Sequence, residues 1–387
     1  MKITVRIIQI LVGVLFIFSG FIKAIDPLGL AYKMEEFFQL WNTSLAEGHL
    51  FAKELLIAFL KFWNEHTLFL AVFMITMEIA TGVALLVGWM KRFILTLLLL
   101  LILFFAFLTG YAYLSGKFTN CGCFGDCLPI TPLTSFTKDI LLLVMILCLI
   151  AGQRFLFSTP SRTFRSTIVA GSLVLSLLLQ WYVLNYLPLI DCLPMKKGNN
   201  IAEQMKPPKN AIPSVYETRL VYQNNKTGQL KDMSQAEYND SKIWEDSTWK
   251  WKETKTKLIR QGTDAPRLTN FSLTTIYGTD TTEAILSDPN YLVLYYVNPT
   301  PGNARLIDEN FLNVVHGKGI ASFFVTTSRE SFDSTKQNAV LTCDGTVFRI
   351  AARVNPTIYL LKQGTVVNKW PLKKIGEATT FIKELKK

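Results

Sequence analysis

Five long apolar stretches in the first half of the chain constrain its fold more than any other feature. They lie at residues 5–23, 67–89, 93–114, 135–153 and 166–189. A helix needs about 20 mostly apolar residues to cross the hydrocarbon core of a bilayer. Such a helix satisfies its own backbone hydrogen bonds, so lipid accommodates it readily. The sequence therefore predicts an integral membrane protein with an α-helical bundle of about five spans.

The second half of the chain reads as a soluble region, and the mean hydropathy of +0.28 averages over this division. Residues 1–195 carry 13 Lys and Arg against 10 Asp and Glu, and residues 196–387 carry 27 against 19. Nucleic-acid binding would gather this basic excess into a dense patch, which the sequence lacks. We expect contact with anionic lipid headgroups instead. The predicted domains are 1–195 (membrane), 196–264 (linker with a small strand-rich region, strands at 219–222 and 244–251) and 265–387 (α/β).

Lys and Arg in the short loops predict the orientation in the membrane, because such loops are retained in the cytoplasm. They are Lys2, Arg6, Lys91, Arg92, Arg154, Arg162 and Arg165. Five spans place all of them on one side. Residues 24–66, 115–134 and everything after about 190 then face outward. We expect a multi-pass protein of the bacterial inner membrane with an uncleaved first helix, a cytoplasmic N-terminus and a periplasmic C-terminal domain.

Residues 31–66 mix aromatic and charged side chains and do not form a clean span. This composition is typical of amphipathic helices at the membrane interface. A cap over the end of the helical bundle fits equally well.

The order of elements in the C-terminal region predicts a thioredoxin-like domain. Strands are expected at 282–286, 291–297, 320–327 and 347–350, a hairpin at 358–370, and helices at 304–315 and 375–385. Pro356 precedes the hairpin, where thioredoxin-like domains carry a cis-proline beside their peptide-binding groove. The position expected for Cys-x-x-Cys instead begins at Asn298 and contains no cysteine. The usual dithiol reaction is excluded there because its nucleophile is a thiolate; we expect Cys343 to be a buried structural thiol.

A cluster of cysteines, Asn120-Cys121-Gly122-Cys123-Phe124-Gly125-Asp126-Cys127, lies in the loop before the fourth span. Glycine permits the tight turns that let sulfur atoms converge. The sequence leaves several disulfide pairings open: Cys121–Cys123, Cys123–Cys127, and Cys123 or Cys127 with Cys192. Three uses fit: a static disulfide, a redox-active pair, or zinc bound by three thiolates, although no histidine lies nearby. The catalytic candidates are Cys121 and Cys123, with Cys127 and Cys192 as further members, and no metal site is predicted.

Glu78 lies near the middle of the second span. Carboxylates inside a membrane are costly and usually face the bundle interior or a water-filled cavity. Two states of Glu78 are open: it stays protonated, or it pairs with Arg6 or Lys23. Its use is a structural hydrogen bond between helices, or a functional one as a proton relay or quinone contact.

The membrane half resembles the DoxX-like proteins, and specifically the branch of methylamine utilisation protein MauE. The resemblance is carried by Gly13, Ser19-Gly20, Lys23, Asp26-Pro27, Glu78, Gly82, the Cys121-to-Gly125 signature and Ser135-to-Asp139. The whole chain resembles a Bacteroidetes family in which this half is fused to a degenerate thioredoxin-like domain. Cys127 and Cys192 depart from the usual pattern.

The resemblance implies thiol–disulfide redox or protein maturation in the periplasm. If Cys121 and Cys123 are redox-active, their expected partner is a periplasmic thiol protein or a respiratory quinone. The alternative function is a non-catalytic membrane scaffold whose thioredoxin-like domain binds a periplasmic partner. The redox partner, the direction of electron flow, the oligomeric state and any link to methylamine metabolism are left open.

Overall fold

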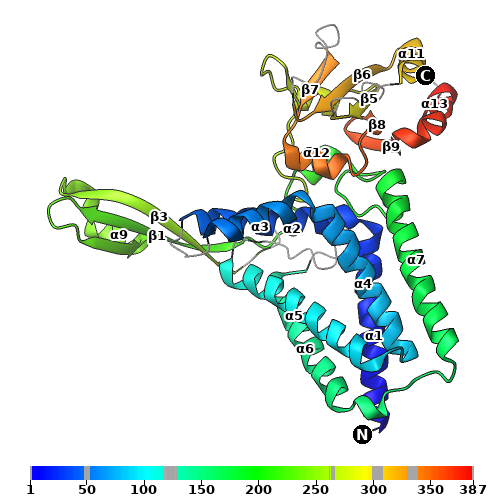
Figure 1. The fold of residues 1–387 in the computed structure, drawn as a ribbon. Coiled ribbons are helices and arrows are strands. Elements are labelled where there is room, and N and C mark those ends of the chain that lie inside the picture. The colour runs from blue at the N-terminus through cyan, green and yellow to red at the C-terminus, as the bar shows by residue number, and fades with distance from the viewer. Residues whose placement is uncertain are drawn as a thin grey trace. The chain divides into compact units, whose positions relative to one another are not determined.

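The fold is known from a computed structural model of the chain (Figure 1), which describes residues 2–47, 53–116, 118, 127, 130–260, 262, 266–298, 308–328 and 339–385. The chain divides into two compact units, one formed by residues 1–201 and 270–387 and the other by residues 202–269. Cys121 and Cys123 lie outside the described residues.

The described residues contain five helices long and apolar enough to cross a membrane, as predicted. They are α1 (Lys2–Ile25), α4 (Thr67–Val87), α5 (Lys91–Ser115), α6 (Pro132–Ala151) and α7 (Arg162–Tyr186). Side-chain caps begin two of them: the hydroxyl of Thr131 accepts the N–H of Thr134 before α6, and Ser161 does the same for Phe164 before α7. Such caps satisfy backbone donors that the first helical turn leaves without a partner. The prediction of about five spans is therefore confirmed.

The interfacial segment forms two helices, α2 (Pro27–Glu47) and α3 (Lys53–Glu65). Helix α2 buries Met34 and Phe38 in the core of the helical bundle, so it acts as a cap. Helix α3 buries Leu60 but leaves Phe59 and Phe62 more than half exposed. These exposed aromatic side chains give α3 an outward apolar face, as expected for a helix lying at a membrane interface. The packing of α2 therefore agrees with a cap over the bundle, and the interfacial position of α3 stays a prediction.

Helices α1 and α4 pack closely because glycines remove the side chains between them. A Cβ atom at Gly82 would lie 2.9 Å from the carbonyl oxygen of Gly13 and 3.1 Å from the backbone nitrogen of Ile17. Small residues at a membrane helix interface let two backbones approach in this way. The packing holds α1 and α4 at a fixed register, which matters for the pair of charged residues that they carry.

We expect Gly82→Ala to lower the free energy of unfolding by about 1–3 kcal/mol, the usual cost of overpacking. The added methyl group would meet backbone atoms of α1, which cannot rotate away. Thermal unfolding of the purified protein in detergent measures the loss. The control is Gly171→Ala on α7, where a Cβ has nothing within 4 Å. Equal melting temperatures for the two variants would contradict the close contact.

The C-terminal region contains a six-stranded mixed sheet, which confirms the predicted α/β class. The strand order is β4-β7-β6-β5-β8-β9. The bounds are β4 (Thr274–Thr275), β5 (Tyr291–Tyr296), β6 (Ala321–Thr326), β7 (Val340–Thr342), β8 (Thr357–Lys362) and β9 (Thr365–Pro371). Strand β5 is parallel to β6 and antiparallel to β8, and its residues 292–296 are fully buried. Helices α11 (Glu309–Gly317) and α13 (Ile375–Glu384) pack on the sheet.

The predicted hairpin is present, and its two turn residues explain its tightness. Gln363 and Gly364 both have positive φ, 48° and 70°. Two-residue hairpin turns of this kind match the twist of the flanking strands. The predicted strands at 291–297 and 320–327 are also confirmed, and the predicted helix at 304–315 is described from Glu309 onward.

Two predicted strands are wrong. Residues 347–350 belong to helix α12 (Gly345–Ala351), because the carboxylate of Asp344 accepts the N–H groups of Thr346 and Val347 and caps a helix. Residues 282–286 belong to α10 (Thr282–Ser287), where Asp280 accepts the N–H of Thr282. Both stretches are apolar and short, and such runs fit a strand or a helix by periodicity alone.

The second unit is a small antiparallel sheet, in agreement with a strand-rich segment. Its strands are β1 (Val215–Asn224), β2 (Leu230–Ser234) and β3 (Trp249–Arg260), in the order β2-β1-β3. A capping box between Ser234 and Glu237 begins helix α9 (Gln235–Ser241). Predicted strand 244–251 overlaps β3 only at its end.

Candidate functional site

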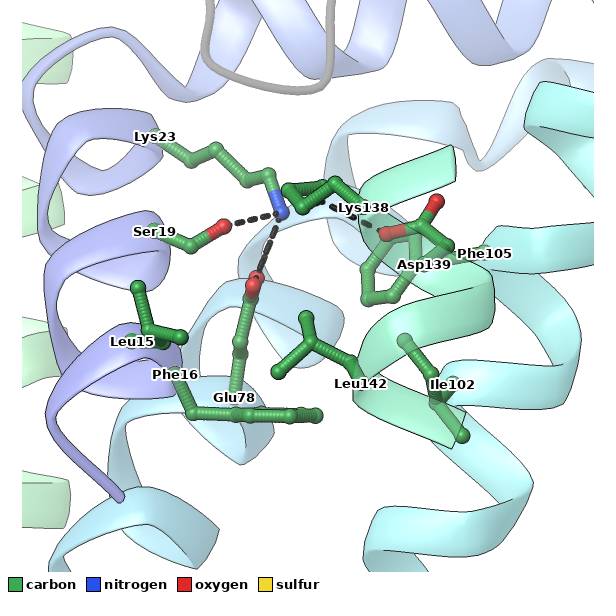
Figure 2. A pocket seen from close by; sticks show the side chains of 10 residues that line it. All are labelled: Leu15, Phe16, Ser19, Lys23, Glu78, Ile102, Phe105, Lys138, Asp139 and Leu142. Atoms are coloured by element: carbon green, nitrogen blue, oxygen red, sulfur yellow. Dashed lines mark hydrogen bonds and ion pairs between the residues drawn. The ribbon is translucent and has the colours of Figure 1, made fainter. Parts of the chain in front are cut away.

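A pocket inside the helical bundle gathers four charged side chains among apolar ones (Figure 2). Its lining comes from α1, α4, α5 and α6: Leu15, Phe16, Ser19, Lys23, Glu78, Ile102, Phe105, Lys138, Asp139 and Leu142. The pocket encloses about 10 Å³, which is about the space that one water molecule needs. As it stands, the pocket accommodates a water molecule or a proton but not a quinone ring.

Lys23 of α1 and Glu78 of α4 form an ion pair sealed inside the bundle. The Lys23 Nζ atom lies 2.9 Å from Glu78 Oε1 and 2.7 Å from Oε2, and their side chains are 2% and 4% exposed. The ammonium also donates to Ser19 Oγ at 3.2 Å and lies 4.3 Å from the centre of the Phe105 ring. Attraction between the charges must offset the cost of removing both from water, so close geometry is required.

Asp139 of α6 contributes a second buried carboxylate to the same pocket. Its side chain is 1% exposed, and its Oδ2 atom accepts a hydrogen bond from the Thr109 hydroxyl of α5 at 3.0 Å. Lys138 Nζ lies 2.8 Å from Asp139 Oδ1. The Lys138 side chain is 26% exposed, so this second pair reaches the surface of the bundle whereas Lys23 and Glu78 do not.

Of the two partners predicted for Glu78, the structure has Lys23. Arg6 is exposed, and its guanidinium lies over the ring of Phe157, 5.8 Å from the ring centre. Sequence reasoning did not single out Asp139 as a partner in this pocket. The available signal was an acidic residue at the fifth position of the predicted span 135–153, because carboxylates inside membrane spans are rare.

The cysteines are only partly described. Cys127, before α6, forms a disulfide with Cys192, after α7. This pairing was one of the alternatives that the sequence left open. Cys148 and Cys343 are the free cysteines among the described residues. The catalytic candidates Cys121 and Cys123 lie outside the described residues.

Pro356 follows a cis peptide bond from Asn355, and Asn355 fixes the neighbouring end of β5. Its side chain accepts the N–H of Asn298 at 3.0 Å and donates to the carbonyl oxygen of Asn298 at 2.9 Å. Asn298 stands where the predicted Cys-x-x-Cys position begins. These two hydrogen bonds therefore join Asn298 to Asn355, and no cysteine takes part in the contact.

Cys343, the one cysteine of the C-terminal region, is buried, and burial raises the pKa of its thiol to about 12. A thiol of that pKa carries almost no thiolate at neutral pH, and the thiolate is the reactive form. The thiol is thus chemically inert, in agreement with the structural role expected for it.

Ion pairs tie α12 to the corner between α1 and α2. Arg353 Nε lies 3.0 Å from Asp26 Oδ2, and Arg349 donates to both carboxylate oxygens of Glu35 at 2.9 Å. Both guanidinium groups also lie over the ring of Tyr32, at 4.9 Å and 5.3 Å. Bidentate arginine–carboxylate contacts are among the more specific polar interactions. Asp26 follows Lys23 by three residues, so this corner lies close along the chain to the buried ion pair.

Comparison with known families gives two matches. Residues 1–152 match the family of methylamine utilisation protein MauE, and residues 216–261 match a domain of unknown function (DUF8463). No curated protein matches the chain, and no solved structure matches it. The first match includes every residue that lines the pocket, together with Cys121, Cys123 and Cys127, but not Cys192 or the C-terminal region. The chain is therefore a membrane protein whose first 152 residues are MauE-like.

Proposed function

We propose that this MauE-like membrane protein supports thiol–disulfide chemistry on the outer side of the bacterial inner membrane, with Cys121 and Cys123 as the exchanging pair. The observation that carries the proposal is the disulfide between Cys127 and Cys192. It assigns two of the four cysteines on the outer side to a fixed link. A cysteine forms one disulfide at a time, so neither of these two is available to Cys121 or Cys123.

The disulfide also supports the proposed orientation. Disulfides persist in oxidising compartments such as the periplasm and are rare in the cytosol. With five spans, the loop of Cys127 and the segment of Cys192 lie on one side, opposite the basic loops, and the C-terminal region follows Cys192. Charge bias and cysteine pairing thus favour the same periplasmic side.

In the proposed reaction, a thiolate of a periplasmic protein attacks the Cys121–Cys123 disulfide and forms a mixed disulfide. A second thiolate of that protein then displaces the remaining cysteine. The partner is oxidised by two electrons and gives up two protons, and Cys121 and Cys123 are left reduced. A membrane quinone that accepts two electrons and two protons would restore their disulfide.

A second function, partner binding without catalysis, is favoured by the chemistry of the C-terminal region. We propose that this region is a thioredoxin-like domain, on the support of its strand order and the cis-proline at Pro356. Asn298 replaces the first active-site cysteine and Cys343 is inert, so such a domain would bind rather than oxidise. Its groove beside Pro356 would pair with an extended peptide, a form of strand addition.

Thiol trapping in intact cells tests the redox function. In a background with Cys148→Ser and Cys343→Ser, a membrane-impermeant maleimide has only the outer-side cysteines to label. We expect Cys121 and Cys123 to become labelled when respiratory quinone is depleted and to be protected when it is restored. Labelling in only one of these conditions is the signature of a pair that cycles.

The matched control is the Cys121→Ser, Cys123→Ser double variant, which should leave the periplasmic thiol proteins of the cell more reduced than wild type does. A pair that stays oxidised with and without quinone would rule out redox cycling. If the double variant also preserved the redox state of those proteins while cross-linking near Pro356 captured a partner, the binding function would replace the catalytic one.

A further inference from the structure

We propose that the pocket of Lys23, Glu78, Lys138 and Asp139 is a proton-binding site, with Glu78 as the acceptor and the Lys138–Asp139 pair as its route to the outer side. The site is distinct from the cysteines and does not depend on the proposed thiol chemistry. Its ligand is the proton, delivered from bulk water.

The pocket holds more than one buried acidic side chain. A structural tie between two helices requires at most one ion pair, and replacing such a pair by apolar residues is often neutral or stabilising. Here a second carboxylate, Asp139, is buried against the same pocket as Lys23 and Glu78. Ionisable groups kept inside a membrane bundle usually mark a path for ions or protons.

The two ion pairs differ in their exposure to solvent. Lys23 and Glu78 are closed to solvent, whereas Lys138 is about a quarter exposed and touches the buried Asp139. Of the four charged side chains that line the pocket, Lys138 is therefore the one that reaches the surface of the bundle. The pocket between the pairs has room for about one water molecule, and a single water is enough to bridge two groups for proton transfer.

The charged side chains of the pocket lie at different depths along their helices. Lys23 lies near the end of α1, and Lys138 lies in the second turn of α6. With alternating spans these two helix ends belong to the same side as Cys127, and Glu78 lies deeper, near the middle of α4. The cluster thus leads from the outer side toward the middle of the membrane.

The proton step involves no other bond. A proton from bulk water passes by Asp139 and the bridging water to a Glu78 oxygen, forming a carboxylic acid. The charged groups that line the pocket are Lys23 of α1, Glu78 of α4, and Lys138 and Asp139 of α6, while α5 supplies Ile102 and Phe105. Nearby Asp26 is engaged by Arg353. With Glu78 neutral, the Lys23 ammonium keeps its hydrogen bond to Ser19 and its contact with the Phe105 ring.

Infrared difference spectroscopy of the full-length protein in lipid nanodiscs tests the site. On acidification we expect a carboxylic-acid band that is sensitive to deuterium exchange and is absent in Glu78→Gln. In Lys138→Met and Asp139→Asn the band should persist, but its exchange with heavy water should slow about a hundredfold, the low end of what a positioned proton-transfer group contributes. Lys33→Met, which breaks an exposed pair with Glu36, should leave both band and rate unchanged.

Three results would each overturn the proposal. One is the lack of any such band at every pH at which the protein stays folded, which would make both pairs structural. Another is a band that survives Glu78→Gln. The third is an exchange rate that neither Lys138→Met nor Asp139→Asn alters. Because Lys138 is partly exposed, its variant should fold even if Glu78→Gln folds poorly.

Discussion

Glu78→Gln should destabilise the helical bundle by about 3–5 kcal/mol, the usual cost of removing one partner from a buried ion pair. The substitution keeps the size of the side chain but leaves the Lys23 ammonium, 2% exposed, without its counter-charge. Asp139 lines the same pocket, so partial compensation by its carboxylate would place the loss at the lower end. The free energy of unfolding in mixed micelles of detergent and SDS measures this loss.

A double-mutant cycle separates the ion pair from the packing around it. Lys23→Met alone should cost about as much as Glu78→Gln, because it leaves a buried carboxylate instead. The double variant Lys23→Met, Glu78→Met removes both charges of the pair together and should recover most of the lost stability. Its recovery would identify uncompensated charge as the cause of the single losses.

The matched control is Lys33→Met on α2, whose pair with Glu36 is also 2.7 Å long but exposed. Exposed pairs three residues apart in a helix contribute about 0.2–0.5 kcal/mol, so this variant should unfold almost as wild type does. If the two single losses of unfolding free energy simply added in the double variant, Lys23 and Glu78 would not stabilise the bundle as a pair. If Lys33→Met and Lys23→Met lost equal stability, burial would not be what makes the Lys23–Glu78 pair important.

The membrane half could be predicted from sequence because its signal is long and local. Each span is 20 or more residues of apolar helix, and a bilayer admits few other structures. Glu78 stood out for the same reason, as a carboxylate inside an apolar span. The short elements of the C-terminal region had no such signal. Val347 and Phe348 are residue types that favour strands, and the N-terminal cap from Asp344 is what favours a helix here.

The candidate site is built from contacts between residues far apart in the sequence, and local sequence patterns do not reveal such contacts. Arg353 and Asp26 are 327 positions apart, and either residue alone reads as an ordinary surface charge. Asp139 became part of the pocket only when α5 and α6 were placed against α1 and α4. The pairing of Cys127 with Cys192 was one of several that the spacing allowed, since cysteine connectivity cannot be deduced from sequence alone.

Breaking the Cys127–Cys192 disulfide should be the second large effect. The bond closes a loop with a sequence separation of 65 that contains α6 and α7. Loop-closure entropy for a soluble chain of that length predicts about 4 kcal/mol. In a membrane both helices remain inserted after unfolding, so the helix ends next to the two cysteines stay on one side and the bond removes less freedom. We therefore expect a loss of about 2 kcal/mol for Cys127→Ser, measured by the same unfolding titration.

Three comparisons make this test specific. Cys192→Ser should cost the same as Cys127→Ser and the double variant no more than either, because all three lack one and the same bond. Cys148→Ser, at an exposed position in α6, should unfold as wild type does. A protease site placed between α6 and α7 should give fragments that stay joined on a non-reducing gel and separate when reduced.

The disulfide should also affect the C-terminal region, because Cys192 adjoins an ion pair made with that region. Asp191 Oδ2 lies 2.5 Å from Lys369 Nζ in β9, and the Lys369 side chain is only 8% exposed. A chain released at Cys192 lets Asp191 move, which would leave the buried ammonium without its partner. We expect faster amide exchange in β9 of Cys127→Ser than in wild type. If β9 exchanged at the wild-type rate while the bundle lost stability, the disulfide would fix the two helices without supporting the sheet.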